Sequence, residues 1–481
     1  MFGLSKVLII GGGVAGLSAG IYSRLAGHEA IICEKHSVLG GNLAGWDRQG
    51  YHIDNCIHWL TGTNPNGMFY KMWEELGALG NIDVYQAEQL YTVERDGVKI
   101  PLYRDISRLE ARMLEVSPED SVEIKKLIRA VNEIRLLVGT GGDTRDQKAG
   151  VLGAVRAISA LAPYYSMSVG ELAKKFSHPL IGDLMLSIFG THFGAIPMMY
   201  VWATFCGNDG GIPVGSSTAM AERMRERFES LGGRVMTKKE AVKINKENGI
   251  ARSVCFADGD EISADYIIST CDPKIVFDRL LGEKMPKNLA RLYSSAKSKR
   301  FSSFHVAFAC DNDVVPFKGD YVFELPEKYK KILFTNYFVI REFSHERGFA
   351  PEGKRVLQTL SFVDERTAAW FVELKRDPPK YSRIKKRFTA TLLDIIYEKF
   401  PELRGKISVL DSWTPATYKR FTGSEAGAYM SFILPKKKLP KTLTPKSKSA
   451  RNLIFATQWQ SPPGGLPIAA QVGRDAVKKI K

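Results

Sequence analysis

The N-terminal segment carries the pattern that most constrains the fold of this chain. An apolar run at residues 7–10 leads into Gly11-Gly12-Gly13-Val14-Ala15-Gly16, which has the spacing G-x-G-x-x-G, and Glu34 follows eighteen residues after Gly16. This order predicts a buried strand, a glycine turn, a helix and a second strand that ends in an acid. Because the context is right on both sides of the glycines, we interpret it as a dinucleotide site rather than an ordinary glycine-rich turn.

Each conspicuous residue of this pattern has a physical role. Gly11 allows the tight turn, and Gly13 lets the backbone approach a pyrophosphate. Gly16 lets the helix pack closely on the sheet. Glu34 is expected to accept hydrogen bonds from a ribose hydroxyl.

Two further motifs resemble a family of flavoproteins. Gly40-Gly41-Asn42 and residues 50–56 (Gly-Tyr-His-Ile-Asp-Asn-Cys) are similar to E-x-x-x-x-x-G-G-R and G-x-x-x-D-x-G in amine oxidases, phytoene desaturases, carotenoid isomerases and retinol saturases. The chain departs from this pattern at Asn42, where the family has arginine, and at Asn55-Cys56, where it has one residue and then glycine. Because Asn42 removes a cation, we expect backbone N–H groups to carry more of the pyrophosphate binding.

The C-terminal segment resembles the same family independently. A short strand is expected at residues 452–456, followed by a loop with Trp459 and Pro462-Pro463-Gly464-Gly465, and then a helix at residues 468–480. This is similar to the G-x-W-x-x-P-G-G-G-x-P closing motif of phytoene desaturases and carotenoid isomerases. A helix N-terminus carries partial positive charge that stabilises a reduced flavin. A loop that caps an ordinary helix is the competing interpretation, but the two ends agree, and the resemblance implies FAD.

The middle of the chain fits the same family. Residues 210–216 resemble a loop that leads into a helix, and residues 230–270 predict a helix end, a strand, a hairpin with an Asp258-Gly259 turn and another strand. The resemblance implies that this segment returns to the nucleotide domain, where the backbone at Val242 contacts the adenine. The full set of implied cofactor-binding residues is Gly11, Gly13, Val14, Ala15, Gly16, Glu34, Lys35, Gly41, Asn42, Leu43, His58, Val242, Gln460, Gly465 and Leu466.

His58 is the candidate catalytic residue. The turn after Asp54 is expected to pass beside the flavin ring, where an imidazole can donate to the ring or move a substrate proton. A core histidine bonded to the backbone is the competing interpretation. Since no Ser/His/Asp triad, metal cluster or paired carboxylates stand out, the flavin is expected to carry the redox step.

The predicted fold is α/β with an α+β second domain. A discontinuous, Rossmann-like FAD-binding domain is expected from residues 1–90, 205–275 and 445–481. A substrate domain of mixed sheet and helices, residues 91–204 and 276–444, is inserted between them. Strand-like runs at 303–309, 331–340 and 356–362 suit a sheet facing the flavin, and residues 381–400 suit a helix that covers it.

Composition is that of a large globular enzyme. The 481 residues are 44% hydrophobic and 25% charged, and the six cysteines show no C-x-x-C or metal spacing. We therefore expect reduced thiols, no metal and a cytoplasmic protein without a secretory signal.

Residues 184–208 contain no charged side chain. We interpret them mainly as two short buried helices broken near Pro197, although the uncharged stretch is also long enough to span a membrane. A third interpretation is the lining of a hydrophobic substrate channel, for which the suitable side chains are Phe189, Phe193, Met198, Met199, Tyr200, Trp202 and Phe205.

The formal charge of +16 is concentrated in two places. One is a proline-rich loop with Lys436, Lys437, Lys438, Lys441, Lys446, Lys448 and Arg451, and the other lies at residues 375–387. Solvated surface is the simplest interpretation, and nothing suggests a nucleic-acid-binding module. Docking of the loop on an anionic membrane surface is the functional alternative.

The resemblance implies an FAD-dependent oxidoreductase that acts on carbon–carbon bonds of a hydrophobic polyene or isoprenoid lipid. Desaturation, saturation and redox-neutral isomerisation remain open. The alternatives are an unsaturated fatty acid isomerase or reductase, an amine oxidase, and a flavin- or lipid-binding protein without catalytic activity.

Overall fold

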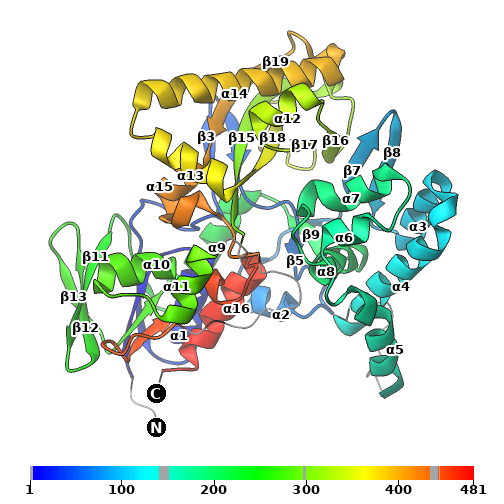
Figure 1. Cartoon of the computed structure of the whole chain (residues 1–481). Helices are drawn as coiled ribbons and strands as arrows, with labels where there is room; N and C mark the ends of the chain where they lie inside the picture. The colour runs from blue at the N-terminus through cyan, green and yellow to red at the C-terminus, as the bar shows by residue number, and fades with distance from the viewer. Residues whose placement is uncertain (1–3, 140–150, 296–298, 434–442, 444, 481) are drawn as a thin grey trace.

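The computed structural model describes residues 4–139, 151–295, 299–433, 443 and 445–480. Figure 1 shows three parts: a parallel sheet with its covering elements at lower left, a larger mixed sheet under the long helix α14 at the top, and a group of helices at the right. The mixed α/β class predicted from the sequence is confirmed.

The parallel sheet joins strands that are far apart in the sequence. In spatial order they are β10 (Arg234–Met236), β2 (Glu29–Cys33), β1 (Lys6–Ile10), β14 (Tyr266–Ser269) and β20 (Leu453–Phe455), and every neighbouring pair is parallel. Val7, Leu8 and Ile9 of the central strand are fully buried, because both faces of the sheet are covered.

Different elements cover the two faces of this sheet. The helices α1 (Val14–Leu25), α9 (Ser216–Ser230) and α16 (Leu466–Val477) pack on one face. The other face carries the antiparallel strands β11 (Ala241–Glu247), β12 (Ile250–Phe256) and β13 (Glu261–Ser263), the helices α10 (Pro273–Ile275) and α11 (Lys287–Ser294), and a π-helical turn, Val276–Leu281. Gly16 is required for close packing, because a Cβ there would lie 1.9 Å from the Gly11 carbonyl oxygen.

The mixed sheet has seven strands. Their order is β19 (Ile407–Trp413), β15 (Phe301–Asp311), β18 (Lys354–Asp364), β17 (Tyr337–Glu342), β16 (Asp320–Glu324), β7 (Gln89–Arg95) and β8 (Val98–Tyr103). Only the pair β16 and β7 is parallel. The helices around it are α12 (Glu327–Leu333), α13 (Glu365–Leu374), α14 (Pro378–Lys399) and α15 (Pro415–Thr422).

Strand alternation sets which side chains of β15 face inward. Phe304, Val306 and Phe308 pack in the core beneath α14, together with side chains of that helix. Residues Phe301, Ser303 and His305 lie on the opposite face and line a cavity.

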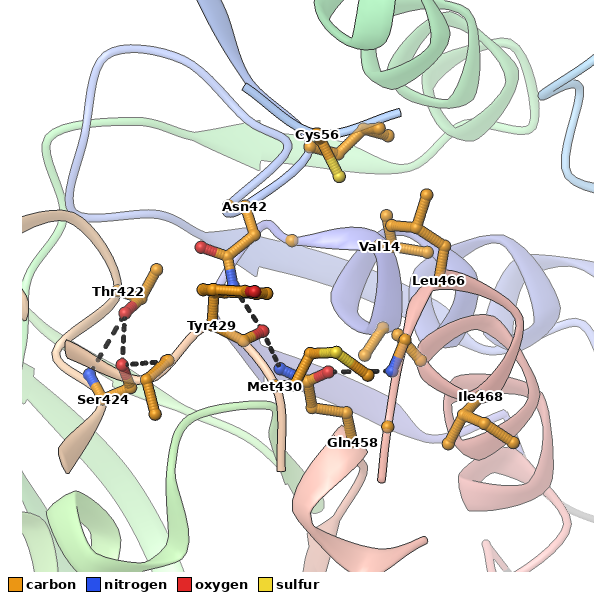
Figure 2. A pocket seen from close by; sticks show the side chains of 18 of the residues that line it. Val14, Asn42, Cys56, Thr422, Ser424, Tyr429, Met430, Gln458, Leu466 and Ile468 are labelled. Carbon is orange, nitrogen blue, oxygen red and sulfur yellow. Dashed lines mark hydrogen bonds between the residues drawn. The ribbon is translucent and has the colours of Figure 1, made fainter. Parts of the chain in front are cut away.

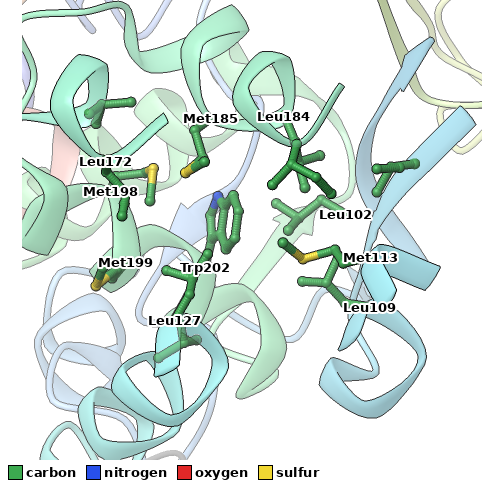
Figure 3. Packing of buried hydrophobic residues seen from close by; sticks show 14 of the residues in the cluster. Leu102, Leu109, Met113, Leu127, Leu172, Leu184, Met185, Met198, Met199 and Trp202 are labelled. Carbon is green, nitrogen blue, oxygen red and sulfur yellow. The ribbon is translucent and has the colours of Figure 1, made fainter. Parts of the chain in front are cut away.

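The helical part has its own core. It contains α3 (Ile106–Val116), α4 (Ser121–Leu137), α5 (Val151–Leu161), α6 (Val169–Ala173), α7 (Pro179–Phe189) and α8 (Ala195–Cys206). Figure 3 shows Trp202 of α8 among leucine and methionine side chains of this core, including Leu109, Met113 and Met185. The core also includes Leu102 of β8, so the helices are anchored on the mixed sheet.

Smaller elements connect the three parts. They are the hairpin β3 (Gly45–Arg48) and β4 (Tyr51–Asp54), the sheet of β5 (Leu60–Thr61), β9 (Gly210–Pro213) and β6 (Val84–Tyr85), α2 (Tyr70–Glu75), and 3-10 turns at Pro118–Asp120, Ala162–Tyr164, Asn312–Val314, Pro401–Leu403, Glu425–Gly427 and Gln458–Gln460.

Several element boundaries differ from the predicted ones. The break in the uncharged stretch falls at residues 190–194, and Pro197 lies in the first turn of α8, where its missing N–H group costs little. Within 331–340, the strand begins only at Tyr337, because Lys331 to Leu333 end α12. The last helix begins two residues earlier than expected, at Leu466.

The proposed division into domains needs one adjustment. Val276, Phe277, Leu280 and Leu289 fall in the segment assigned to the substrate domain, yet they pack in the core under the parallel sheet. We therefore propose the same discontinuous arrangement, with this helical stretch belonging to the nucleotide-binding domain.

Candidate functional site

A cavity of about 740 Å³ lies where the three parts meet. Its wall begins at the carboxyl ends of β1, β2 and β14, passes the closing loop before α16, and ends among apolar side chains of the mixed sheet and of α7 and α8. Ligands of open parallel sheets bind at these carboxyl ends.

The glycine turn opens directly onto the cavity. Gly11, Gly13, Val14 and Ala15 line the wall, and Gly13 is the N-cap of α1 with no side chain to cap the first N–H groups. A second helix N-terminus, that of α16, is also on the wall, at Gly465 and Leu466, and also lacks a side-chain cap. Two uncapped N-termini give this end of the cavity positive potential and free donors, which fits a pyrophosphate and an anionic ring.

Glu34 is held rigidly at the nucleotide end. Its carboxylate accepts hydrogen bonds from the N–H groups of Gly12 at 2.8 Å and His36 at 3.0 Å, and the side chain is buried. It lines the cavity beside Lys35, whose Nζ donates to the Arg420 carbonyl at 2.9 Å. Burial lowers the pKa of Lys35.

The closing loop and the N-terminal segment meet at one carbonyl oxygen, that of Tyr429. Asn42 Nδ2 donates to it at 3.2 Å and Gln458 Nε2 at 3.0 Å, while Gln458 Oε1 accepts from the Gly465 N–H at 3.1 Å (Figure 2). Figure 2 also shows Cys56 across the open space from this cluster. Asn42, Gly41 and Leu43 all line the cavity.

Three residues of the predicted set lie outside the cavity wall. Gly16 is buried between α1 and β1, where its role is in packing. Val242 is 39% exposed, and its neighbour Ala241 lines the cavity instead. Gln460 is buried with its Oε1 accepting from the Thr457 N–H, and Gln458 is the glutamine on the wall.

His58 lines the cavity, as expected, next to a buried ion pair. Its Nδ1 lies 3.4 Å from Asp320 Oδ2, and Arg341 pairs with Asp320 and donates to the Ile57 carbonyl at 3.0 Å. Burial, reinforced by Arg341, lowers the pKa of His58. Although burial opposes it, the charge of Arg341 lowers the pKa of Asp320 to about 2.

The wall also contains a group of polar side chains of which only Asn55 belongs to a sequence motif. Ser303 and His305 of β15, Tyr418 of α15 and Asn55 after β4 come together, with Ser303 Oγ 2.7 Å from His305 Nε2. The alternation of Ser303 and His305 along the strand predicted at 303–309 was the available signal, since such residues share one face.

The apolar end agrees only partly with the proposed channel lining. Phe189, Phe193 and Tyr200 line the cavity, whereas Met198, Met199, Trp202 and Phe205 are buried in the helical core. Other apolar side chains on the wall are Trp59, Leu90, Tyr91, Ile188, Val201, Phe301, Leu360 and Phe362.

The predicted basic docking loop falls mainly outside the described residues, at Lys436, Lys437, Lys438 and Lys441. Its described members Lys446, Lys448 and Arg451 are exposed. In the part of the chain that the structure covers, no helix combines the length and apolar character needed to cross a bilayer.

Comparisons with known proteins agree with this geometry. The family of NAD(P)-binding Rossmann-like domains matches residues 9–76. The chain is similar to a chloroplastic prolycopene isomerase of Daucus carota (23% identity over 88% of this chain and 71% of the relative) and to a 4,4'-diaponeurosporene oxygenase of Staphylococcus haemolyticus strain JCSC1435 (24% identity, 99% and 97%). Its fold is that of a cyclohexylamine oxidase from Brevibacterium oxydans IH-35A, with a TM-score of 0.59, 14% identity and 99% of both chains covered.

The residues of this cavity fit a flavin-type cofactor. The glycine turn and Glu34 provide a dinucleotide end, and the uncapped N-terminus of α16 lies further along the same cavity. With these features and these relatives, the chain resembles the flavin-dependent oxidoreductases in sequence and in fold.

Proposed function

We propose that this enzyme binds FAD and acts on carbon–carbon bonds of a hydrophobic polyene or isoprenoid lipid. The observation that carries the proposal is the continuity of one cavity, which joins a dinucleotide end at Gly13 and Glu34 to an apolar end at Phe193 and Phe362. The names of the two sequence relatives, both concerned with carotenoid compounds, support the polyene class.

In this proposal, different residues of the protein hold the cofactor and the substrate. The first N–H groups of α1 would bind the pyrophosphate, Glu34 would accept from the ribose, and the N-terminus of α16 would stabilise negative charge on the bound flavin. The bound flavin supplies two-electron chemistry at a carbon–carbon bond. Phe189, Phe193 and Tyr200 exclude water from the apolar end, and His58 holds or moves a proton there through its imidazole.

The alternatives are distinguished by the charge that each substrate carries. A fatty acid needs a cation at the apolar end, but in the described wall Lys35, Lys239 and Arg279 lie at the nucleotide end. Amine oxidation is favoured by the fold that the chain shares with the cyclohexylamine oxidase, and the fold alone does not determine the reaction. The choice among desaturation, saturation and isomerisation is left to assay.

Two measurements on purified protein test the proposal. Denaturation is expected to release FAD completely into the supernatant, since the binding is expected to be non-covalent. Mass spectrometry of co-purified lipid is expected to identify a polyene or isoprenoid. Flavin that stays bound to the precipitate contradicts the non-covalent mode, and a co-purified fatty acid or amine favours the corresponding alternative.

A further inference from the structure

One part of the cavity wall, here named the polar corner, consists of Asn55, Ser303, His305 and Tyr418. These uncharged side chains come from three different elements and all line the cavity. His305 is fixed from behind by Trp413, whose ring is parallel to the imidazole with centroids 4.6 Å apart. Ser303, His305 and Tyr418 are buried, so their polar atoms must be satisfied by each other or by a ligand.

The polar corner contains a hydrogen-bond donor, the Tyr418 hydroxyl, that its buried acceptors can lose and still remain hydrogen-bonded. Asn55 Oδ1 accepts from both Trp413 Nε1 and Tyr418 Oη, each at 2.8 Å. His305 Nε2 lies 2.7 Å from Ser303 Oγ and 3.1 Å from Tyr418 Oη. Asn55 Oδ1 therefore keeps the Trp413 N–H as a donor when the Tyr418 hydroxyl turns away, so this hydroxyl can donate to a ligand without leaving a buried acceptor unpaired.

The electrostatics of the polar corner select a neutral ligand. Burial lowers the pKa of His305 well below its ordinary value, so the imidazole is neutral at pH 7. Asp320, the acidic side chain on this part of the described wall, is paired with Arg341. Among the described residues here, a carboxylate would find no unpaired cation, and an ammonium group would find no unpaired anion.

Next to the polar corner the same sheet face becomes apolar. Phe301 precedes Ser303 on β15, while Leu360 and Phe362 are the partners of His305 and Ser303 on β18. A molecule that fills both regions is an apolar chain bearing a single uncharged polar group.

We propose that the polar corner binds the oxygen of a hydroxyl or carbonyl group on an otherwise apolar substrate, with the Tyr418 hydroxyl as donor. The inference rests on the proposed function and narrows its substrate class from any polyene or isoprenoid to one that carries a neutral oxygen.

The test compares four probes that share one isoprenoid skeleton. They are the alcohol, the hydrocarbon, the carboxylic acid and the amine, titrated into the flavin-loaded protein and followed by tryptophan fluorescence. We expect the alcohol to bind roughly tenfold more tightly than the other three, as one well-made hydrogen bond allows. Equal binding of alcohol and hydrocarbon, or tighter binding of the acid or amine, overturns the proposal.

A matched pair of variants locates the donor. Tyr418→Phe is expected to weaken alcohol binding by roughly three- to tenfold and to leave hydrocarbon binding and the flavin spectrum unchanged. Tyr91→Phe is the control, because this tyrosine also lines the cavity but its hydroxyl donates to the Leu184 carbonyl at 2.7 Å. If Tyr418→Phe weakens alcohol and hydrocarbon equally, the residue only shapes the wall and the proposal is wrong.

Two further outcomes remain decisive. If Tyr418→Phe does not fold, Ser303→Ala takes its place and is expected to reduce selectively the affinity for the alcohol, since the Tyr418 hydroxyl then has to replace Ser303 as the hydrogen-bond partner of His305 Nε2. If none of the probes binds although FAD is retained, the proposed lipid substrate itself is wrong, and this inference falls with it.

Discussion

Asn42 shows how one residue that departs from a family motif takes a different physical role. The arginine expected at this position contributes a cation, but Asn42 donates instead to the Tyr429 carbonyl that Gln458 also contacts. The residue therefore ties the N-terminal segment to the segment at Tyr429 that the closing loop also contacts, and we propose that the backbone of the glycine turn binds the phosphates.

Gly13 provides the first prediction at this scale. It lines the cavity at the start of α1, so the side chain in Gly13→Val occupies the space that the pyrophosphate needs. We expect the affinity for FAD to fall by at least roughly a hundredfold, measured as flavin retained after gel filtration. Gly348→Val is the control, because that position is exposed and a Cβ there would have no atom within 4 Å. Normal retention in Gly13→Val contradicts the assigned site.

His58 provides the second prediction. We expect His58→Ala to keep the flavin and to lose turnover by roughly a hundredfold, the scale of one acid or base group. Because burial lowers its pKa, His58 is neutral at pH 7 and becomes protonated only as the pH falls below about 6.5. Protonation in the folded state is disfavoured, so its contribution to stability is complete above that pH and declines below it.

The measurement is the pH profile of kcat for both proteins. The wild type is expected to lose activity on the acid side, and His58→Ala is expected to lack that limb. Full turnover in His58→Ala removes any catalytic role and leaves His58 as a core histidine beside the Asp320 and Arg341 pair.

At the scale of elements, one carboxylate fixes the turn that brings His58 to the cavity. Asp54 at the end of β4 accepts from the Ser217 N–H and hydroxyl at the start of α9, both at 2.6 Å, and from the Cys56 N–H at 3.0 Å. The aspartate of the family motif is therefore a bridge between a hairpin and a helix N-terminus. The substitution of Cys56 for glycine leaves this bridge intact.

We predict that Asp54→Ala lowers the free energy of unfolding by about 2 kcal/mol, since it leaves several buried donors unpaired. Flavin retention is expected to fall as well, because the turn after Asp54 lines the cavity. Denaturant unfolding measures the first effect. Asp105→Ala, which removes an exposed N-cap of α3, is the matched control, with an expected loss of about 1 kcal/mol. A loss in Asp54→Ala no greater than in the control contradicts the bridge.

At the scale of the whole molecule, the cavity forms only because segments that are distant in the sequence pack together. Its wall draws on the first strand, the middle of the chain and the last helix, because the parallel sheet joins β1, β14 and β20. A lipid substrate partitions into bilayers, so we propose that the enzyme docks on a membrane surface through its basic loop.

Liposome sedimentation tests this proposal. Each lysine near an anionic leaflet gains about 1 kcal/mol, and salt screens the attraction over roughly 8–10 Å. We expect binding to anionic liposomes at low salt, release at high salt, and weaker binding of the variant Lys436→Gln, Lys437→Gln, Lys438→Gln. Replacing the exposed Lys380, Arg383 and Lys386 of α14 by Gln is the charge-matched control. If the fraction of protein that sediments does not depend on salt or on lipid charge, the loop is ordinary solvated surface.

The sequence by itself determined the nucleotide end of this protein. The glycine turn, Glu34 and the loop before α16 are local patterns, in which the conformation of a few consecutive residues sets the function. Such patterns can be interpreted without knowing the rest of the fold, and Gly11, Gly13, Glu34 and Gly465 all lie on the cavity wall.

The other end of the cavity, where we propose that the substrate binds, was decided only by tertiary structure. Tyr418, Asn55 and His305 are distant in the chain and meet because β4, β15 and α15 converge. The same limit explains why Tyr200 reached the cavity while Trp202 was buried in the core: both lie on α8, and only the packing of this helix decides which side chain faces the cavity. The sequence shows that a side chain is apolar. Whether that side chain lies in the core or lines the cavity depends on which other elements pack beside it.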